Sequence, residues 1–180
     1  MPNYRRARVA GGTYFFTVVT YRRHPVFHQE PAIRLLEQSF SLVGAEYPFI
    51  LEAMVILPDH LHCIWTLPDG DADFSGRWRR IKARFSRKYV RSGHPPLPVS
   101  MQKKGEKAIW QRRFWEHTIR DEEEFCRYCD YIHYNPVKHG LAASPIEWSH
   151  SSFRRFVENG SYDVDWGHEM PLRIRGMDLE

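Results

Sequence analysis

The sequence predicts an α+β fold, in which helices pack on an antiparallel sheet. Short runs rich in β-branched and aromatic residues alternate with longer segments of helical periodicity. Two of the strand-like runs are separated only by Pro58-Asp59, a turn pair that favours a hairpin between antiparallel neighbours. A chain of 180 residues with 42% hydrophobic residues suffices for one core but not for two ordinary domains, so residues 1–180 are expected to form a single domain.

Three strands and one helix are expected in the first half of the chain. Gly-Gly precedes the first strand, which is rich in Thr, Val and aromatic residues. The helix begins at a proline, which suits a first turn, and its apolar residues recur at spacings of three and four. In order, the expected elements are a strand at Thr13–Tyr21, a helix at Pro31–Ala45, a strand at Phe49–Leu57 and a strand at His60–Leu67.

The middle of the chain predicts a basic amphipathic helix, a loop and a fourth strand. The helix covers Gly76–Val90, with its aromatic and aliphatic residues on one side. Residues 92–107 contain Pro-Pro and Lys-Lys-Gly and are expected to form a mobile basic loop. The run Ile109–Ile119 then has the composition of a strand.

The clearest helical signal lies at Asp121–Tyr134. Asp121 and Glu124 resemble a capping box, and acidic residues in the first turn suit the positive end of the helix dipole. Pro136 is expected to close this helix, because the residue before a proline is disfavoured in α geometry. A short helix at Ser151–Val157 and a C-terminal tail at 158–180 are expected to follow.

The basic residues are concentrated, which indicates a polyanionic partner. Residues 74–113 hold 13 of the 26 Lys and Arg residues and one acid, Glu106. A solvated charged helix face is the alternative interpretation of such a run. The candidate phosphate contacts on the helix are Arg77, Arg80, Arg84, Arg87, Lys88 and Arg91, and an N-terminal arm adds Arg5, Arg6 and Arg8.

Several protein classes are disfavoured by the sequence. There is no apolar run of about 18 residues that could span a membrane, and the N-terminus lacks the apolar region of a secretory signal. Three cysteines cannot all pair, so they indicate reduced thiols and a cytoplasmic protein. Cys126-x-x-Cys129 has no second pair to complete a zinc site. Phosphate-loop, dinucleotide-binding and common hydrolase motifs are absent.

The first candidate site is His60-Leu61-His62. Residues two apart on a strand point to the same face, so both imidazoles project together while Leu61 and Cys63 point to the other face. Two convergent imidazoles with one further ligand can hold a divalent metal with open positions. An incidental His-x-His in a strand remains the alternative from spacing alone.

The second candidate site is formed by Tyr131 and Asn135, which lie one helical turn apart and share a face. Tyr128 and Tyr134 flank the same stripe. An aromatic packing face is the alternative, and periodicity alone favours it. A tyrosine hydroxyl has a pKa near ~10, so it becomes a useful nucleophile only beside a cation or base, or against an electrophile that a metal has activated.

Four blocks in fixed order make the chain recognisable. Together they closely resemble the REP-associated tyrosine transposases, a bacterial branch of the single-tyrosine HUH transposases, and the resemblance extends from about Tyr4 to Trp166. The matching blocks are Gly11–Val18, Leu57–Trp65, Trp110–His117 and Tyr131–Leu141.

This resemblance implies a fold and a set of site residues. The fold would be the HUH palm, a ferredoxin-like antiparallel sheet with helices on it. His60 and His62 match the His-hydrophobe-His motif, and Tyr131 matches the nucleophile. Asn135 matches the polar residue that completes the site for Mg²⁺ or Mn²⁺; related HUH transposases often carry Gln there.

The resemblance also implies an activity. The expected function is metal-dependent cleavage and strand transfer of single-stranded DNA through a 5′-phosphotyrosine. The expected partners are hairpins of repetitive extragenic palindromes (REPs) with an adjacent tetranucleotide. The expected protein is a bacterial cytoplasmic, nucleoid-associated monomer, with a homodimer as the alternative. The functional alternatives are a non-catalytic hairpin-binding protein and an RNA-binding protein. Trp78, Trp110 and Trp115 are expected either to stack on bases or to fill the core.

Overall fold

The computed structural model describes residues 8–91 and 109–179. A four-stranded sheet lies at its centre, and every neighbouring pair of strands is antiparallel. Along the sheet the order is β2-β3-β1-β4, which with the chain order β-α-β-β-α-β gives the ferredoxin-like arrangement. The predicted fold class is therefore confirmed. The strands are β1 (Thr13–Val19), β2 (Ile50–Ile56), β3 (His60–Thr66) and β4 (Trp115–Ile119).

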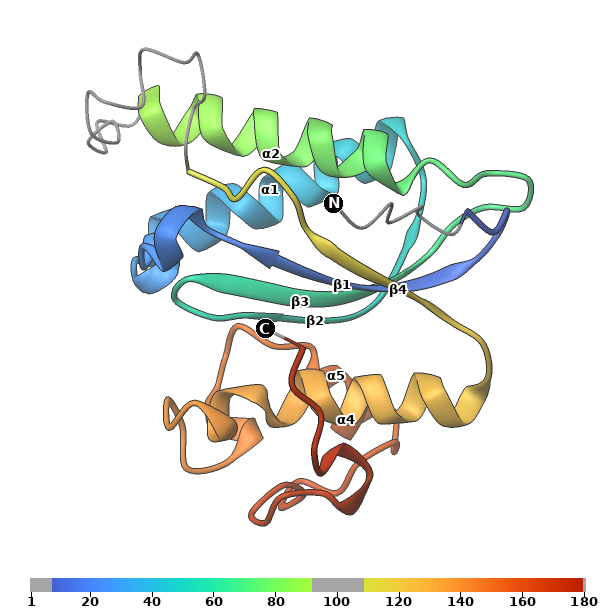
Figure 1. Cartoon of the computed structure of the whole chain (residues 1–180). Helices are drawn as coiled ribbons and strands as arrows, with labels where there is room; N and C mark the ends of the chain where they lie inside the picture. The colour runs from blue at the N-terminus through green and yellow to red at the C-terminus, as the bar shows by residue number, and fades with distance from the viewer. Residues whose placement is uncertain (1–7, 92–108, 180) are drawn as a thin grey trace.

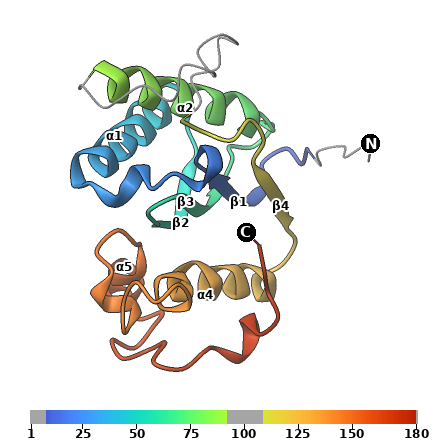
Figure 2. The same ribbon diagram turned by 60° about the vertical axis from the view of Figure 1, so that its left-hand side comes forward.

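Helices cover both faces of the sheet. Helices α1 (Glu30–Glu46) and α2 (Phe74–Arg91) lie side by side on one face, and α4 (Glu122–Lys138) and α5 (Phe153–Glu158) lie on the other (Figures 1 and 2). None of the described helices is long and apolar enough to cross a membrane. The loop predicted at 92–107 and the arginines Arg5 and Arg6 lie outside the described residues.

Two buried clusters use opposite faces of the same strands. Phe16 and Cys63 belong to the larger cluster, which α1 and α2 cover. Phe15 and Ile64 belong to the second cluster, against α4. Strands β1 and β3 are central and buried on both faces, which explains their nearly continuous apolar composition. Side chains of β3 with odd residue numbers therefore point toward α1 and α2, and those with even numbers point toward α4.

The predicted fourth strand is interrupted. Ladder pairing of β4 with β1 ends at Thr17↔Trp115, and the next pairing is a single bridge between Thr20 and Trp110. Between these pairings β1 contributes residues 18–19, whereas the other chain segment contributes residues 111–114. Two extra residues cannot join a regular ladder, so residues 111–114 form a bulge: the Gln111 amide still donates to the Val19 carbonyl at 2.9 Å, and the chain leaves β1 after it. The continuous strand predicted from Ile109 is wrong for this reason.

Helix α4 is longer than predicted, because it continues through Pro136 to Lys138. Proline removes only one N–H, and near the end of a helix this loss is small. The last turn is still closed, since the His139 amide donates to the Asn135 carbonyl at 3.0 Å and the Leu141 amide donates to the Pro136 carbonyl at 2.9 Å. As a result, Lys138 stays on the helix that carries Tyr131.

At its N-terminus, α4 is capped as predicted by Asp121, whose carboxylate accepts from the Glu124 amide at 2.8 Å. The Glu124 carboxylate does not return to Asp121. It accepts from the Arg120 amide and from His117 Nε2, both at 2.8 Å. Burial alone would raise the pKa of Glu124, but these hydrogen bonds and the Arg120 side chain lower it to about 2. Glu124 thus ties β4 to the start of α4.

We predict that Glu124→Gln destabilises the protein by about 1–2 kcal/mol at neutral pH, because hydrogen bonds to a charged group are lost. The folded pKa lies below the usual value of 4.5, so this stabilisation is present above about pH 5 and disappears as the pH falls toward 2. Urea unfolding at several pH values should show the two proteins converging in acid. Glu122→Gln, an exposed change in the same turn, is the control, and a pH-independent difference for Glu124→Gln would contradict the assignment.

Candidate active site

His60 and His62 project from the same face of β3, with ring centroids 4.9 Å apart. Leu61 and Cys63 lie in the opposite cluster, as the strand alternation predicts. Both histidines are buried, and the Nε2 atom of each is inaccessible to solvent. The two imidazoles therefore face a common interior point beneath the sheet.

Each histidine is oriented through its Nδ1 atom. Asp59 Oδ1 lies 2.5 Å from His60 Nδ1, and Thr17 Oγ1 lies 2.9 Å from His62 Nδ1. Burial alone would raise the pKa of Asp59, but the hydrogen bond from His60 and the neighbouring Arg23 lower it. A carboxylate at Nδ1 favours a proton there, so Nε2 of His60 carries the lone pair.

The tautomer of His62 follows from Thr17 and the C-terminal tail. The Thr17 hydroxyl donates its single proton to the Leu179 carbonyl at 2.8 Å. It must then accept from His62 Nδ1, because a hydroxyl has only one proton to give. This arrangement leaves the lone pair of His62 on Nε2 as well. Both histidines thus present a basic nitrogen to the interior.

Helix α4 lays one face across the two histidines. The Tyr131 ring lies 5.2 Å from the His62 ring, and the His139 ring lies 5.3 Å from the His60 ring. Asn135 is one turn from each of these helix residues, so it faces the histidine pair from between them. Its side chain is fully buried, and within residues 8–91 and 109–179 neither amide atom has a hydrogen-bond partner.

These residues fit a divalent cation. Two imidazole nitrogens and an amide oxygen form a mixed nitrogen and oxygen set, and a buried amide that lacks a protein partner is explained if a ligand completes it. No cluster of three His, Cys, Asp or Glu side chains suitable for a metal occurs in the described part of the chain. If a divalent cation binds here, the Asn135 amide oxygen would be the third protein donor, and water or a phosphate oxygen would supply the others.

The three tyrosines of α4 have different surroundings. Tyr128 packs on Phe15 and His117, with centroids at 4.6 and 5.1 Å, and burial followed by the charge of Glu124 raises its pKa to about 12. Tyr134 packs beside Gly167 of the tail. Of the three tyrosines, Tyr131 contacts both a histidine of the pair, His62, and a lysine, Lys138.

Lys138 was not identified from the sequence as a site residue. Its Nζ donates to the Tyr131 hydroxyl at 3.2 Å and lies 5.0 Å from the centre of the Tyr131 ring. The two residues are seven positions apart, which is two turns along one helix face. The seven-residue spacing could have identified Lys138 from the sequence. A helix that ends at Tyr134, as predicted, does not include Lys138.

The tail also reaches the site. The Leu179 amide donates to the Tyr131 hydroxyl at 3.4 Å, while its carbonyl accepts from Thr17. Figure 2 shows the end of the chain entering between the sheet and α4. Upstream, Ile174 is buried against the cluster that contains Tyr131. No sequence pattern in the tail predicted this contact.

The structure does not support the predicted phosphate contact at Arg77. Its side chain is only 3% exposed, and its guanidinium donates to the carbonyls of Tyr47, Pro48 and Asp73 and to the Asp71 carboxylate. The Asp71 bond is 2.7 Å long, and it lowers the pKa of that carboxyl. Arg77 holds α2 to the segment before β2, and its buried guanidinium, which uses four of its five N–H donors within the protein, is not placed to contact a DNA phosphate.

The other basic residues of α2 lie on the opposite face of the sheet from Tyr131 (Figure 1). Arg80 stacks on Tyr47 at 3.9 Å, and Arg84 pairs with Glu46 at 3.1 Å. Their role in DNA binding stays a prediction. The same holds for the exposed Arg8 and Arg87, for Lys88, which donates to Gln38, and for Arg91, whose side chain lies outside the described part of the chain.

The tryptophans divide into core and surface. Trp78 and Trp110 are buried in the cluster under α1 and α2, which agrees with a core role. Trp115 is 39% exposed at the start of β4. Next to it, Arg112 and Arg113 are exposed on the bulge.

Comparison with known proteins places this geometry in a family. A family model described as IS200-like transposase matches residues 8–135. A REP-associated tyrosine transposase of Escherichia coli (strain K12) is 41% identical over 171 residues, which are 94% of this chain and 93% of that protein. The chain belongs to the REP-associated tyrosine transposases.

Two further matches agree. A relative of this transposase in Haemophilus influenzae is 39% identical over 98% of the chain and 99% of its own length. A solved structure of a REP-associated tyrosine transposase bound to a REP hairpin matches with a TM-score of 0.78 at 41% identity, covering 95% of this chain and 94% of that one. The ferredoxin-like sheet and its helices are thus shared with a family of DNA transposases.

We predict that Arg77→Ala acts on stability rather than on DNA binding. Loss of the hydrogen bonds made by its buried guanidinium should lower the free energy of unfolding by about 2–3 kcal/mol. Arg79→Ala, at an exposed neighbour, is the control and should stay within about 0.5 kcal/mol. Urea unfolding measures both. Full stability of Arg77→Ala combined with weakened hairpin affinity would restore the phosphate-contact assignment.

Proposed function

We propose that the protein is a metal-dependent single-stranded DNA endonuclease and strand transferase, which cuts REP-type hairpins through a covalent 5′-phosphotyrosine at Tyr131. The observation that carries the proposal is the position of the Tyr131 hydroxyl. The hydroxyl lies beside Lys138, and the Tyr131 ring meets the His62 ring edge-on, on the helix face that also presents Asn135 to the histidine pair. The relative solved with a REP hairpin supports this class of partner.

The metal of the proposed reaction is Mg²⁺ or Mn²⁺. His60 Nε2, His62 Nε2 and the Asn135 amide oxygen would hold it, since these atoms are buried and face one another across the sheet and α4. When bound, such an ion would supply Lewis-acid polarisation of the scissile phosphate. Asp59 and Thr17 fix the rings, so the ligand nitrogens are aimed before any metal arrives.

In the proposed step, the Tyr131 oxygen attacks phosphorus and forms a P–O bond, while the bond from phosphorus to the 3′ oxygen breaks. The phenol proton leaves to solvent, and the departing oxygen takes up a proton to become a 3′-OH. Lys138 holds a positive charge beside the attacking oxygen and the phosphate. The phosphotyrosine ester conserves the bond energy, so a second 3′-OH can reverse the step without a nucleotide cofactor.

The proposal also specifies the oligomeric state of the protein and the structure of its DNA substrate. Helix α4 follows β4 after only Arg120 and Asp121, which keeps Tyr131 and Asn135 against the sheet of their own chain and supports action as a monomer. The DNA would be a hairpin with a tetranucleotide at its foot, and such binding would associate the protein with the bacterial nucleoid. Because Leu179 contacts both Tyr131 and Thr17, the substrate strand must displace it before the tyrosine can react.

We predict that Tyr131→Phe abolishes the covalent protein–DNA adduct and lowers cleavage more than about 1,000-fold, because only the attacking oxygen is removed. Tyr128→Phe and Tyr134→Phe are matched controls on the same helix and should keep measurable cutting. End-labelled hairpins on denaturing gels report both products and adduct. Persistence of the adduct in Tyr131→Phe would identify a different nucleophile, and free ends without an adduct in the unmutated protein would indicate a plain nuclease.

A second prediction tests the metal ligands. His60→Ala or His62→Ala should abolish cleavage yet leave hairpin affinity within a few-fold, because phosphate contacts supply most of the affinity. Calorimetric titration with Mn²⁺ should show weaker metal binding in both variants, independently of activity. Unchanged cleavage in EDTA would rule out a role for these residues as metal ligands in the reaction.

A further inference from the structure

We propose that the hollow beneath the bulge at 111–114 binds one base of the substrate strand, next to the phosphate that Tyr131 attacks, with Trp115 as its stacking platform. This bulge pocket is a cavity of about 560 Å³ whose walls include Thr17, Arg113, Trp115 and Leu179. The inference rests on the proposed function, because it names the nucleotide subsite of the same reaction.

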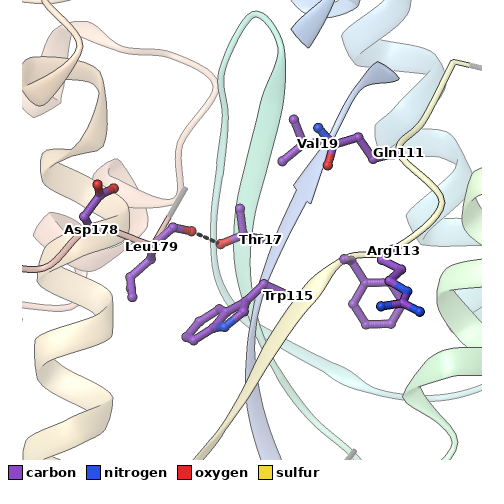
Figure 3. A pocket seen from close by; sticks show the side chains of 8 residues that line it. Thr17, Val19, Gln111, Arg113, Trp115, Asp178 and Leu179 are labelled. Carbon is purple, nitrogen blue, oxygen red and sulfur yellow. Dashed lines mark hydrogen bonds between the residues drawn. The ribbon is translucent and has the colours of Figure 1, made fainter. Parts of the chain in front are cut away.

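The pocket exists because the ladder between β1 and β4 is broken at this point. Four residues of one segment oppose two of β1, so the chain stands away from the sheet after Gln111, whose amide still donates to the Val19 carbonyl, and leaves a space beside it. The volume lies within the range typical of small-ligand sites, roughly 300–1,000 Å³. Figure 3 shows Thr17, Arg113 and Trp115 arranged around this space, with Leu179 on the side of the tail.

Trp115 has the properties of a stacking platform. It is 39% exposed, whereas Trp65, Trp78 and Trp110 are at most 8% exposed in the core. Its ring lies nearly parallel to that of His117, at an interplanar angle of 8°, and contacts Phe15 edge-on at 5.7 Å. These contacts hold a flat aromatic surface at the pocket wall. An aromatic face of this kind stacks on any nucleobase.

The charge at the rim suits a nucleotide. Arg112 and Arg113 are exposed on the bulge, and Arg113 lines the pocket, where its guanidinium can meet a phosphate or a base edge. The acid at the pocket is Asp178, which belongs to the tail and lies 3.9 Å from Lys138. It would leave with the tail when the substrate strand displaces Leu179.

Two wall residues connect the pocket to the chemistry. Thr17 lines it and orients His62, and Leu179 lines it while its amide contacts the Tyr131 hydroxyl. A base held on Trp115 would therefore be attached to, or one nucleotide from, the phosphate at Tyr131. The pocket would thus select which phosphate of the strand reaches the tyrosine.

The test uses a REP hairpin with single-stranded flanks and a series of hairpins in which each flanking base in turn is replaced by an abasic site. Affinity is measured by fluorescence anisotropy in EDTA with the Tyr131→Phe protein, so it does not depend on cleavage. We expect one abasic position to weaken binding about tenfold, since stacking of a base contributes roughly 5- to 150-fold in affinity. In the Tyr131→Phe protein, the additional substitution Trp115→Ala should weaken binding of the intact hairpin to a similar extent. The abasic site at that position should then cause no further loss of affinity.

Trp115→Phe should keep the wild-type abasic profile, because the smaller ring still stacks. Arg113→Ala, which removes no core contact, should weaken binding, while the exposed Arg34→Ala on α1 serves as its control. An unchanged profile in Trp115→Ala would overturn the proposal, even if adduct formation at Tyr131 is normal. Failure of the proposed cleavage would appear separately, as a missing adduct with an intact stacking profile.

Discussion

The arrangement of the site depends on the packing of α4 against one face of a sheet whose central strands are buried on both faces. On β3, residues 60, 62 and 64 point toward α4, and residues 61, 63 and 65 point toward α1 and α2. Six buried residues thus fill two interiors, and the histidines share theirs with the cluster that fixes α4. The same packing that stabilises this half of the fold brings Tyr131 and Asn135 opposite His60 and His62.

Hydrogen bonds around the histidines turn this packing into a defined geometry. Asp59 lies in the β2–β3 turn and Thr17 lies on the neighbouring strand, so each ring is fixed by an element that the sheet already positions. Burial makes rotation of these rings costly, because a buried nitrogen would lose its partner. The donor atoms are consequently arranged by folding itself.

Local spacing placed the candidate residues on shared faces and the family resemblance gave them roles, whereas long-range contacts escaped prediction. The alternation of His60 and His62 and the four-residue interval from Tyr131 to Asn135 are properties of a strand and a helix alone. The role of Arg77 depends on carbonyls about thirty positions upstream, so helical periodicity alone assigned it to an outward basic face. The bulge at 111–114 is likewise invisible until its partner strand is known, because its composition is that of an ordinary strand.

Both Tyr131 and Asn135 are carried by one continuous helix, and this has a consequence for how the gene can change. An inserted or deleted residue between them would turn one about 100° around the helix axis relative to the other, so they could no longer share a face. Substitutions at the three intervening positions keep this spacing, although at His133 they also remove a hydrogen bond to Ser152. The geometry thus constrains the length of this interval more strictly than the identity of its residues, and we expect alignments of active members to contain no gap there.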